Sequence, residues 1–550
     1  MEMEETGEEN AVMAKGALWQ NATNILIKLS AFVYTVIIAR LVAQDDVGVF
    51  YFAIGILGTL QIFVDLGLTT AIMRYLPYYF GKKDNAQAKK ILNLTVFLGI
   101  FLMFVFSAAL FLASGLIAQS FGNPKLEMML KLLSISVAIT QTFTILSSLM
   151  VSMKKLREYS IGGTVQAIAK LVLTIILIVA IGADARSLGI AFMGSTIIAA
   201  AYLLYEMRGL LGWAQAQGTF SISEYIESAK ELIPFGITMV GVLTFSTIIG
   251  YFDRIMLGYF LTSDANNQIA IYTLSISFAG MAALFAGSVL SIFYPVISEL
   301  VGKGDFKKVS KTTSTALRWV LFSSIPITAF LVAFSAPLLR VLYGAAYEPG
   351  YLALALFSIG MFANFAGAVQ RTTLAGMRLV KIELLSVGAG ALTNIVLNII
   401  LIPGFGITGA AFAGLASFVV ISSFNQYYAK KYFGFEFPKS AWKNILAGVV
   451  VFAILQVVEL RAYGGLTTLH FGLDNSGILL GVLDKVIKMA ILGVFFAFGS
   501  VIYLALLNLM NLFEAEDFKV CGDLLVKIGL PKSINKLALR LIFWRHKVAA

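Results

Sequence analysis

The sequence is poor in the residues that most enzymes and metal sites use. Its 550 residues include one cysteine, Cys521, and two histidines, His470 and His546. A single cysteine excludes a disulfide within the chain and a metal site built from cysteines. The histidines lie 76 residues apart in the sequence, which argues against a histidine metal cluster or a catalytic histidine relay. We therefore expect no metal and no cofactor.

Charged residues are also scarce. They make up 13% of the chain, whereas 59% is hydrophobic and the mean hydropathy is +0.87. Soluble globular proteins carry about 25% charged residues, because a folded surface in water needs them. The composition therefore predicts a membrane protein with many spans, and it excludes disordered, collagen-like and ordinary cytosolic proteins.

Long apolar runs define the fold class. A membrane helix needs about 20 mostly apolar residues. Such runs are continuous here and do not alternate with polar residues, which excludes a membrane β-barrel. We predict an all-α integral membrane protein with about fourteen transmembrane helices, at 17–40, 48–75, 91–120, 126–152, 160–182, 188–207, 231–260, 267–299, 316–336, 351–374, 382–403, 407–428, 445–462 and 480–509.

Lysine and arginine are distributed unequally between the two sides of these spans. The N-terminus, the even-numbered loops and the C-terminal tail hold 29 of the 41, and the odd-numbered loops hold 6. Positive charge accumulates on the cytoplasmic side, so we predict a multi-pass cell-membrane protein with both termini in the cytoplasm. The same asymmetry explains the net charge of +11 without nucleic acid. The N-terminal Met1–Asn10, with its five glutamates, does not resemble a secretory signal.

Four pairs of segments recur in order at offsets of 220 to 224 residues. They are Val47–Ala53 with Ile269–Ser275, Gly81–Asp84 with Gly302–Asp305, Lys170–Ile178 with Asn394–Ile402, and Gly189–Gly194 with Gly409–Gly414. A repeat of six spans returns the chain to the same side, which predicts two pseudosymmetric six-helix bundles of parallel topology around a central cavity.

The repeat also sets the expected domain boundaries. They are an acidic cytoplasmic tail at 1–16, an N-terminal bundle at 17–207, a cytoplasmic linker at 208–230, a C-terminal bundle at 231–428, two additional spans at 429–509, and a basic amphipathic cytoplasmic tail at 510–550. Within the tail, basic residues mix with Phe543 and Trp544 around 533–547, which predicts an interfacial helix on the anionic leaflet.

Several motifs resemble those of a known family. They are Ala39–Leu41 with Val47–Phe50, Tyr251–Gly258, Tyr294–Ser298, Leu342–Gly344 with Tyr347, and, most specifically, Leu401–Ala411. Through them the chain, over about 15–510, resembles the polysaccharide transporter family. These are Wzx-type oligosaccharide flippases of the multidrug/oligosaccharidyl-lipid/polysaccharide (MOP) exporter superfamily. The stretch Ala43–Gly48 departs from the pattern, since relatives often carry a proline there.

This resemblance implies a MOP/MATE-like fold and a function. The expected function is transport, with no enzymatic activity. The expected substrate is a lipid-linked oligosaccharide on a polyprenyl-phosphate type carrier, which moves from the cytoplasmic to the outer leaflet by alternating access. The expected process is cell-surface polysaccharide or glycan biosynthesis. The expected partners are this substrate, membrane lipids and glycan-assembly enzymes. Lipid-linked peptidoglycan-precursor flippases carry an arginine-rich cavity, and the first two spans here have no comparable arginine cluster.

Polar residues inside the spans are the candidate cavity residues. A charge at bilayer depth costs about 2.5–3.5 kcal/mol on insertion scales, so it faces a cavity or a partner. Asn21, Asn24 and Lys28 share one face of span 17–40, and Gln61 and Asp65 lie one turn apart in the next span. They predict a polar cavity wall in the N-terminal bundle. The alternative is a Lys28–Asp65 ion pair that only joins two helices.

Five further candidates lie in later spans. Lys170 and its repeat mate Asn394 are each near the middle of a span, with Asn398 one turn after Asn394. Asp253 and Arg254 lie near the outer end of span 231–260. The alternatives are hydrogen bonds between helices for the asparagines and snorkelling to the outer surface for Arg254. Asp65 and Asp253 are the carboxylates for coupling to Na+ or H+, if transport is ion-driven.

Two other functions stay open at this point. An ion-coupled multidrug exporter of the same superfamily has a core of twelve spans, so the two additional spans count against it. A membrane polysaccharide polymerase or ligase needs acid–base groups on a substantial outer loop. The predicted outer loops are short, and His470 is the only histidine on that side.

Overall fold

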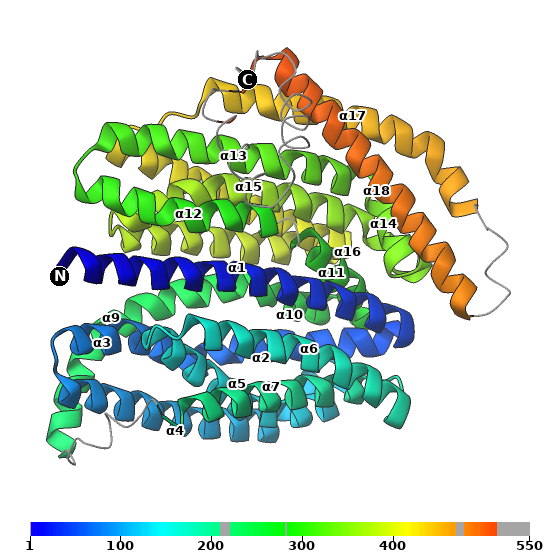
Figure 1. Ribbon diagram of the computed structural model, residues 1–550. Coiled ribbons are helices and arrows are strands. Elements are labelled where there is room, and N and C mark those ends of the chain that lie inside the picture. The colour runs from blue at the N-terminus through cyan, green and yellow to red at the C-terminus, as the bar shows by residue number, and fades with distance from the viewer. Residues whose placement is uncertain (1, 210–220, 281–282, 469–477, 514–516, 518–550) are drawn as a thin grey trace. The chain divides into compact units, whose positions relative to one another are not determined.

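The computed structural model describes residues 2–209, 221–280, 283–468, 478–513 and 517 (Figure 1). Within these ranges every regular element is a helix and no strand is found. Within the described part of the chain, twelve helices are long and apolar enough to cross a membrane. The predicted all-α membrane fold is confirmed. The predicted interfacial helix at 533–547 lies outside the described residues.

Two predicted spans are joined into one helical segment in the structure, and another predicted span is divided between two helices. The segment Lys381–Phe433 covers the predicted spans 382–403 and 407–428, which are joined at Gly406, where the backbone leaves the helical region with φ 53° and ψ −132°. The predicted span 267–299 is divided between α11 (Ala265–Ala279) and α12 (Ala283–Gly302). The count of fourteen stays a prediction.

The chain forms two compact units. The first contains residues 1–281 and 380–421. Its elements are α1 (Glu2–Leu41), α2 (Gln44–Asp65), α3 (Leu68–Gly81), α4 (Asn85–Ser120), α5 (Pro124–Ser152), α6 (Leu156–Ile181), α7 (Ala185–Met207), α9 (Ile222–Thr247), the π-helix η1 (Ile248–Phe252), α10 (Asp253–Phe260), α11 and the first part of α16 (Val380–Phe433).

The second unit contains residues 282–379 and 422–550. Its elements are α12, α13 (Phe306–Ala333), α14 (Ser335–Leu342), the 3-10 helix η3 (Ala345–Gly350), α15 (Tyr351–Gly376), the remainder of α16, α17 (Lys439–Thr468) and α18 (Ile478–Leu509). The units group the helices differently from the repeat, because α9 to α11 and the first part of α16 fall in the same unit as α1 to α7. The predicted bundle boundaries stay a prediction.

The second predicted span is broken in the middle. Helix α2 ends at Asp65, and both Leu66 (φ 41°) and Gly67 (φ 77°) have left-handed backbone conformations before α3 begins at Leu68. The Asp65 carboxylate accepts hydrogen bonds from the backbone N–H of Thr69 at 3.3 Å and from its hydroxyl at 3.0 Å. These bonds satisfy donors at the start of α3 that the helix itself leaves unpaired. Asp65 therefore caps a helix start inside the membrane-spanning region.

Polar contacts also tie the start of α9 to α4. Ser221 and Glu224 form a reciprocal capping box, and Lys90 pairs with Glu224 at 2.9 Å. The hydrogen bonds from the Ser221 backbone N–H and from Lys90 lower the pKa of Glu224 to about 2. Gln87 donates to the Ser228 hydroxyl at 3.1 Å one turn further on. The carboxylate stays ionised down to strongly acidic pH and holds this helix start in place.

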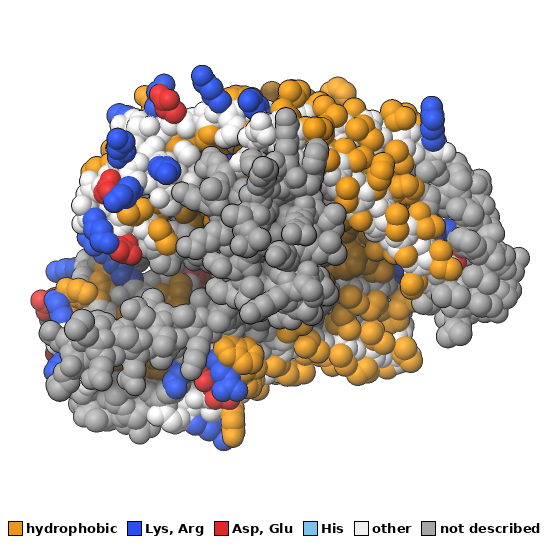
Figure 2. Space-filling view, turned by 45° about the horizontal axis from the view of Figure 1, so that its top comes forward, with side chains coloured by type: hydrophobic (Ala, Val, Ile, Leu, Met, Phe, Trp, Pro, Cys, Tyr) orange, Lys and Arg blue, Asp and Glu red, His pale blue; other side chains and the backbone are white. Residues whose placement is uncertain are grey.

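The outward faces of α4 and α6 are apolar. Leu112 is 79% exposed on α4 and Val179 is 83% exposed on α6. Only 6% of the apolar window of α6 is buried within the protein. In the view of Figure 2, which turns the top of Figure 1 forward, hydrophobic side chains gather on the right of the described surface and most charged side chains on the left. Exposed apolar surface on this scale is unfavourable in water and is what contact with lipid requires.

A buried ion pair anchors the chain beyond α18 within the second unit. Arg318 on α13 donates to an Asp517 carboxylate oxygen at 3.0 Å, and the Trp319 indole donates to the same oxygen at 2.7 Å. The Arg318 and Asp517 side chains are 4% and 5% exposed. The Phe322 and Phe513 rings lie 5.4 Å apart beside this pair. Arg318, which lies near the start of the predicted span 316–336, therefore joins α13 to the chain beyond α18.

This ion pair leads to a prediction about stability. Asp517→Ala leaves a guanidinium in a buried site without its carboxylate, a change that typically costs about 3–5 kcal/mol. We expect a clear fall in the melting temperature of the purified protein in detergent. Glu348→Ala is the matched control, because it removes the carboxylate from the more exposed Arg340–Glu348 pair and is expected to cost less than about 1 kcal/mol. Equal losses in the two variants would contradict the buried pair.

Candidate functional site

A cavity of about 480 Å³ lies within the first unit, among α2, α3, α5, α7, α9 and η1. Small-molecule sites have volumes of about 300–1,000 Å³ and are mostly apolar, with a few polar groups that orient the ligand. This cavity has that character. Its polar lining residues are Gln61, Asp65, Thr69, Thr70, Thr140, Thr144, Thr247 and Tyr251.

Two of these lining residues carry unsatisfied polar atoms. Gln61 donates from Nε2 to the Gln141 amide oxygen at 2.7 Å, but its own Oε1 is buried without a hydrogen-bond partner. The Thr140 hydroxyl is also buried without a partner. Buried polar atoms in proteins are nearly always paired. These two atoms are therefore available to water or to a polar ligand in the cavity.

The sequence placed Gln61 and Asp65 together on one wall, and both line this cavity. Lys28 and Lys170 are not among the lining residues. Lys28 is half-buried, and the described residues contain no ion pair between it and Asp65. Asn24 is exposed, and the side chain of Asn21 lies outside the described part of α1. Of the candidate residues on the first span, Asn24 and Lys28 are described, and neither lines this cavity.

Lys170 has a different neighbour. Its ammonium nitrogen lies 4.4 Å from the centre of the Tyr34 ring, which is 3% exposed. A cation over the face of an aromatic ring is attracted by the ring's quadrupole. Lys170 therefore lies between α1 and α6, in contact with the buried Tyr34.

Asp253 is the centre of a second, fully buried polar cluster. The Tyr272 hydroxyl donates to one oxygen of its carboxylate at 2.5 Å, and the Asn398 amide donates to the other at 2.7 Å. Asn398 also donates to the Asn394 amide oxygen at 3.1 Å. Asp253 is 3% exposed, and both asparagines and Tyr272 are 0% exposed. Helices α10, α11 and α16 thus contribute to one site, which unites three of the predicted residues.

Arg254 is buried and hydrogen-bonded within the first unit, which does not support the snorkelling alternative. Its side chain is 9% exposed. Its Nε donates to the Thr273 hydroxyl at 3.0 Å, and Nη1 donates to the Gly250 carbonyl at 3.2 Å. The guanidinium carbon lies 5.3 Å from the centre of the ring of Tyr251, which lines the cavity. Arg254 therefore lies behind the cavity wall.

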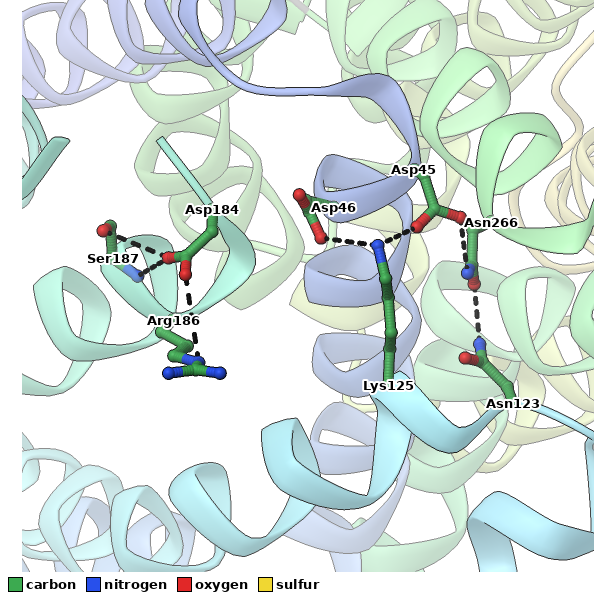
Figure 3. Close-up of polar contacts among 8 residues, drawn as sticks. All are labelled: Asp45, Asp46, Asn123, Lys125, Asp184, Arg186, Ser187 and Asn266. Carbon is green, nitrogen blue, oxygen red and sulfur yellow. Dashed lines mark hydrogen bonds and ion pairs between the residues drawn. The ribbon is translucent and has the colours of Figure 1, made fainter. Parts of the chain in front are cut away.

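A third polar cluster lies at the helix ends that the charge pattern predicts to be outer (Figure 3). Lys125 pairs with Asp45 at 2.6 Å and with Asp46 at 3.2 Å. Asn266 donates to the other oxygen of Asp45 at 2.8 Å, and Asn123 donates to the Asn266 amide oxygen at 2.7 Å. This outer cluster joins the starts of α2, α5 and α11, which are far apart in the sequence.

Sequence reasoning missed several of these residues. Tyr272 is one of these residues, although the repeat contains a sequence signal for it. Tyr272 occupies the position that Phe50 has in the first half, so the second half carries an additional hydroxyl group at this position. Gln141 and Thr140 are adjacent polar residues inside the predicted span 126–152. No sequence signal identified Asn266 or Lys125, because their significance depends on contacts between helix ends.

Family models match two parts of the chain. The model described as "Polysaccharide biosynthesis protein" matches residues 13–301. The MatE model matches residues 238–400.

Two curated relatives align with different lengths of this chain. The uncharacterized membrane protein MJ1068 of Methanocaldococcus jannaschii is 23% identical over 520 residues, which are 92% of this chain and 97% of that protein. The probable low-salt glycan biosynthesis flippase Agl15 of Haloferax volcanii is 22% identical over 287 residues, which are 50% of this chain and 57% of that protein.

Solved structures show the same fold. The lipid II flippase MurJ, in its inward closed conformation, superposes with a TM-score of 0.66 at 16% identity, over 89% of this chain and 99% of that one. An inward-facing multidrug resistance MATE family transporter of the MOP superfamily superposes with a TM-score of 0.63 at 12% identity, over 76% of this chain and 97% of that one.

Proposed function

Because the chain belongs to the polysaccharide biosynthesis protein family, whose model matches more than half of its residues, we propose that it moves a lipid-linked oligosaccharide from the cytoplasmic to the outer leaflet of the membrane. The proposed carrier is a polyprenyl phosphate. Its apolar tail stays in the lipid, while the polar head crosses through the protein.

The observation that carries this proposal is the lining of the cavity. Threonine hydroxyls, the Gln61 amide and the Asp65 carboxylate offer hydrogen-bond partners to sugar hydroxyls, and Tyr251 offers a flat apolar face. Such polar groups are costly at membrane depth unless they face water or a ligand. The volume of about 480 Å³ suits a part of an oligosaccharide head.

Alternating access requires an outer gate, and we assign this role to the outer cluster. The Asp45–Asn266 bond and the two Lys125 ion pairs hold together helix ends on the side where the cargo is released. Asp45 lies in the first half of the repeat and Asn266 in the second half. Separating the halves on this side breaks that hydrogen bond.

Ion coupling is assigned to Asp253. Its carboxylate is the one acidic group in the buried cluster with Tyr272, Asn394 and Asn398, all of which carry oxygen atoms. Carboxylate, amide and hydroxyl oxygens are ligands for hard cations, and a carboxylate can also bind a proton. Na+ or H+ binding there would change the charge of a cluster that joins three helices.

The experiment that tests this function is mass spectrometry of lipid-linked glycans in a deletion strain. We expect accumulation of a complete lipid-linked oligosaccharide on the cytoplasmic side, reversed by the wild-type gene. Normal glycan export together with lost efflux of cationic dyes would instead identify a multidrug exporter. Accumulation of lipid-linked units already exposed outside, awaiting polymerisation, would identify a polymerase or ligase.

Thr140 provides a test of the cavity itself. Thr140→Val preserves the shape of the side chain and removes a hydroxyl that has no partner in the protein, so stability should be unchanged. If the hydroxyl binds the sugar head, apparent substrate affinity should fall about fivefold, the equivalent of one hydrogen bond. The measurement is transport by the purified protein in vesicles as substrate concentration varies.

The matched control for this test is Thr174→Val. Thr174 is also in a membrane helix and is 0% exposed, but its hydroxyl donates to the Lys170 carbonyl and does not line the cavity. We expect no change in transport from it. If the two variants behave alike, the cavity does not hold the sugar head.

A further inference from the structure

A second cavity, of about 460 Å³, lies between α1 and α6 in the first unit and is independent of the site described above. We refer to it as the α1–α6 groove. Residues from α1 and α6 form most of its lining, including Trp19, Leu26, Thr164, Ile168, Val172 and Leu173. Ile168 is 48% exposed and Val172 is 44% exposed, so the groove opens at the surface of the protein.

The groove offers no free polar atom from its two threonines. The Thr23 hydroxyl donates to the Trp19 carbonyl at 2.8 Å, and the Thr164 hydroxyl donates to the Ser160 carbonyl at 3.0 Å. Both bonds lie within a single helix, so these side chains present mainly their methyl groups. Among the described side chains, the rest of the lining is apolar apart from the edge of Trp19. The surface therefore suits a hydrocarbon chain.

The length of the groove matches one leaflet of a bilayer. On α6 it extends from Ile161 to Leu173. At 1.5 Å per residue this is about 18 Å along the helix. Half of the hydrocarbon core of a bilayer is about 15 Å. One acyl chain of a phospholipid in the nearer leaflet has this reach, whereas a polyprenyl carrier is longer than the groove.

Positive charge lies at one end of the groove. The guanidinium carbon of Arg157 is 5.7 Å from the centre of the Trp19 ring. Lys154 and Lys155 are in the turn that precedes α6. Trp19 lies close to the start of the predicted span 17–40, and lysines, arginines and tryptophans concentrate at the ends of membrane helices, so this end lies at the membrane surface, where phospholipid headgroups are found. An apolar groove with cations at its surface end is complementary to an anionic phospholipid.

We propose that the α1–α6 groove binds one acyl chain of an anionic phospholipid, with the lipid phosphate at Arg157. The bound lipid fills the gap between α1 and α6 on the lipid-facing side. This site does not depend on the oligosaccharide function, because none of its residues lines the cavity that contains Gln61 and Asp65.

Quenching of Trp19 fluorescence by brominated lipids tests the proposal on the full-length protein. The protein is reconstituted into vesicles in which either phosphatidylglycerol or phosphatidylcholine carries bromine on its acyl chains, and the Trp19 signal is the difference between wild type and Trp19→Phe. One well-placed cation near a lipid surface corresponds to about a fivefold preference for an anionic lipid. We therefore expect about fivefold preferential quenching of Trp19 by phosphatidylglycerol.

Two pairs of variants separate charge from shape. Arg157→Gln should remove the preference for phosphatidylglycerol, whereas Arg186→Gln, which removes an exposed arginine at the opposite end of the helices, should leave it intact. Val172→Phe fills the groove and should reduce quenching by both lipids. Val179→Phe makes the same change on the same helix at an 83% exposed position and should have no effect.

Native mass spectrometry of the purified chain gives a second measurement that does not rely on Trp19. Retention of one phosphatidylglycerol by wild type and its loss from Arg157→Gln would support the proposal. Equal quenching by the two lipids would overturn it, as would a preference that survives Arg157→Gln. Displacement of the quenching lipid by a small excess of polyprenyl phosphate would also overturn it, because the carrier would then be the occupant.

Discussion

Replacing Asp253 with asparagine is expected to lower the transport rate more than tenfold while the protein folds normally. The carboxylate receives hydrogen bonds from Tyr272 and Asn398, and an asparagine at this position can accept only one of them. The Asn398 Oδ1 and Asn394 Nδ2 atoms are both buried without a partner, so rotation of the two amides together lets Asn398 Oδ1 accept from the new amide group and from Asn394. Asp253→Asn therefore removes the charge and keeps the cluster satisfied.

The measurement for Asp253 is transport in vesicles with imposed Na+ and H+ gradients. Wild type should respond to one of the two gradients, and Asp253→Asn to neither. Asp253→Ala is the control for folding, because it leaves the Tyr272 and Asn398 donors unpaired and is expected to cost about 1–3 kcal/mol for each. If Asp253→Asn transports at the wild-type rate, Asp253 is a structural group and the coupling assignment is wrong.

Gly48→Ala is expected to open the outer side of the protein. A Cβ atom at Gly48 would lie 1.8 Å from the backbone oxygen of Asn266 and 2.4 Å from its carbonyl carbon. Both are backbone atoms, so they cannot move aside unless α2 and α11 separate. Overpacking typically costs about 1–3 kcal/mol, and a clash with the backbone lies at the upper end or beyond. The conformation in which these helix ends meet should be strongly disfavoured.

The readout for Gly48→Ala is labelling of a cysteine at Gln61, on the cavity wall, by an impermeant thiol reagent added outside cells. The background replaces Cys521 with serine. Labelling should rise in Gly48→Ala, and the melting temperature should fall. Gly493→Ala is the matched control, since a Cβ there meets no atom within 4 Å. Asn266→Ala should have a smaller effect, because it removes side-chain hydrogen bonds without a clash. Unchanged labelling in Gly48→Ala would contradict an outer gate at this contact.

The sequence alone determined the class of the protein. Hydropathy and continuous apolar runs depend on the residues themselves and on the thickness of a bilayer, so the all-helical membrane fold was predictable without any contact. Local pairs were predictable for the same reason. Asp484 and Lys488, whose one-turn spacing in the sequence favours an ion pair, form one at 2.7 Å. The one-turn spacing of Gln61 and Asp65 likewise placed both on the same wall.

Only the tertiary structure decided which distant polar residues meet. The repeat paired Asn394 with Lys170, but Asn394 lies with Asn398 and Asp253, while Lys170 contacts Tyr34. The sequence also left the direction of the Arg254 side chain undetermined. Only the structure shows that it donates a hydrogen bond to Thr273 instead of extending to the surface. The physical reason is that helix periodicity specifies which residues share a face, whereas the packing and rotation of neighbouring helices specify what that face touches.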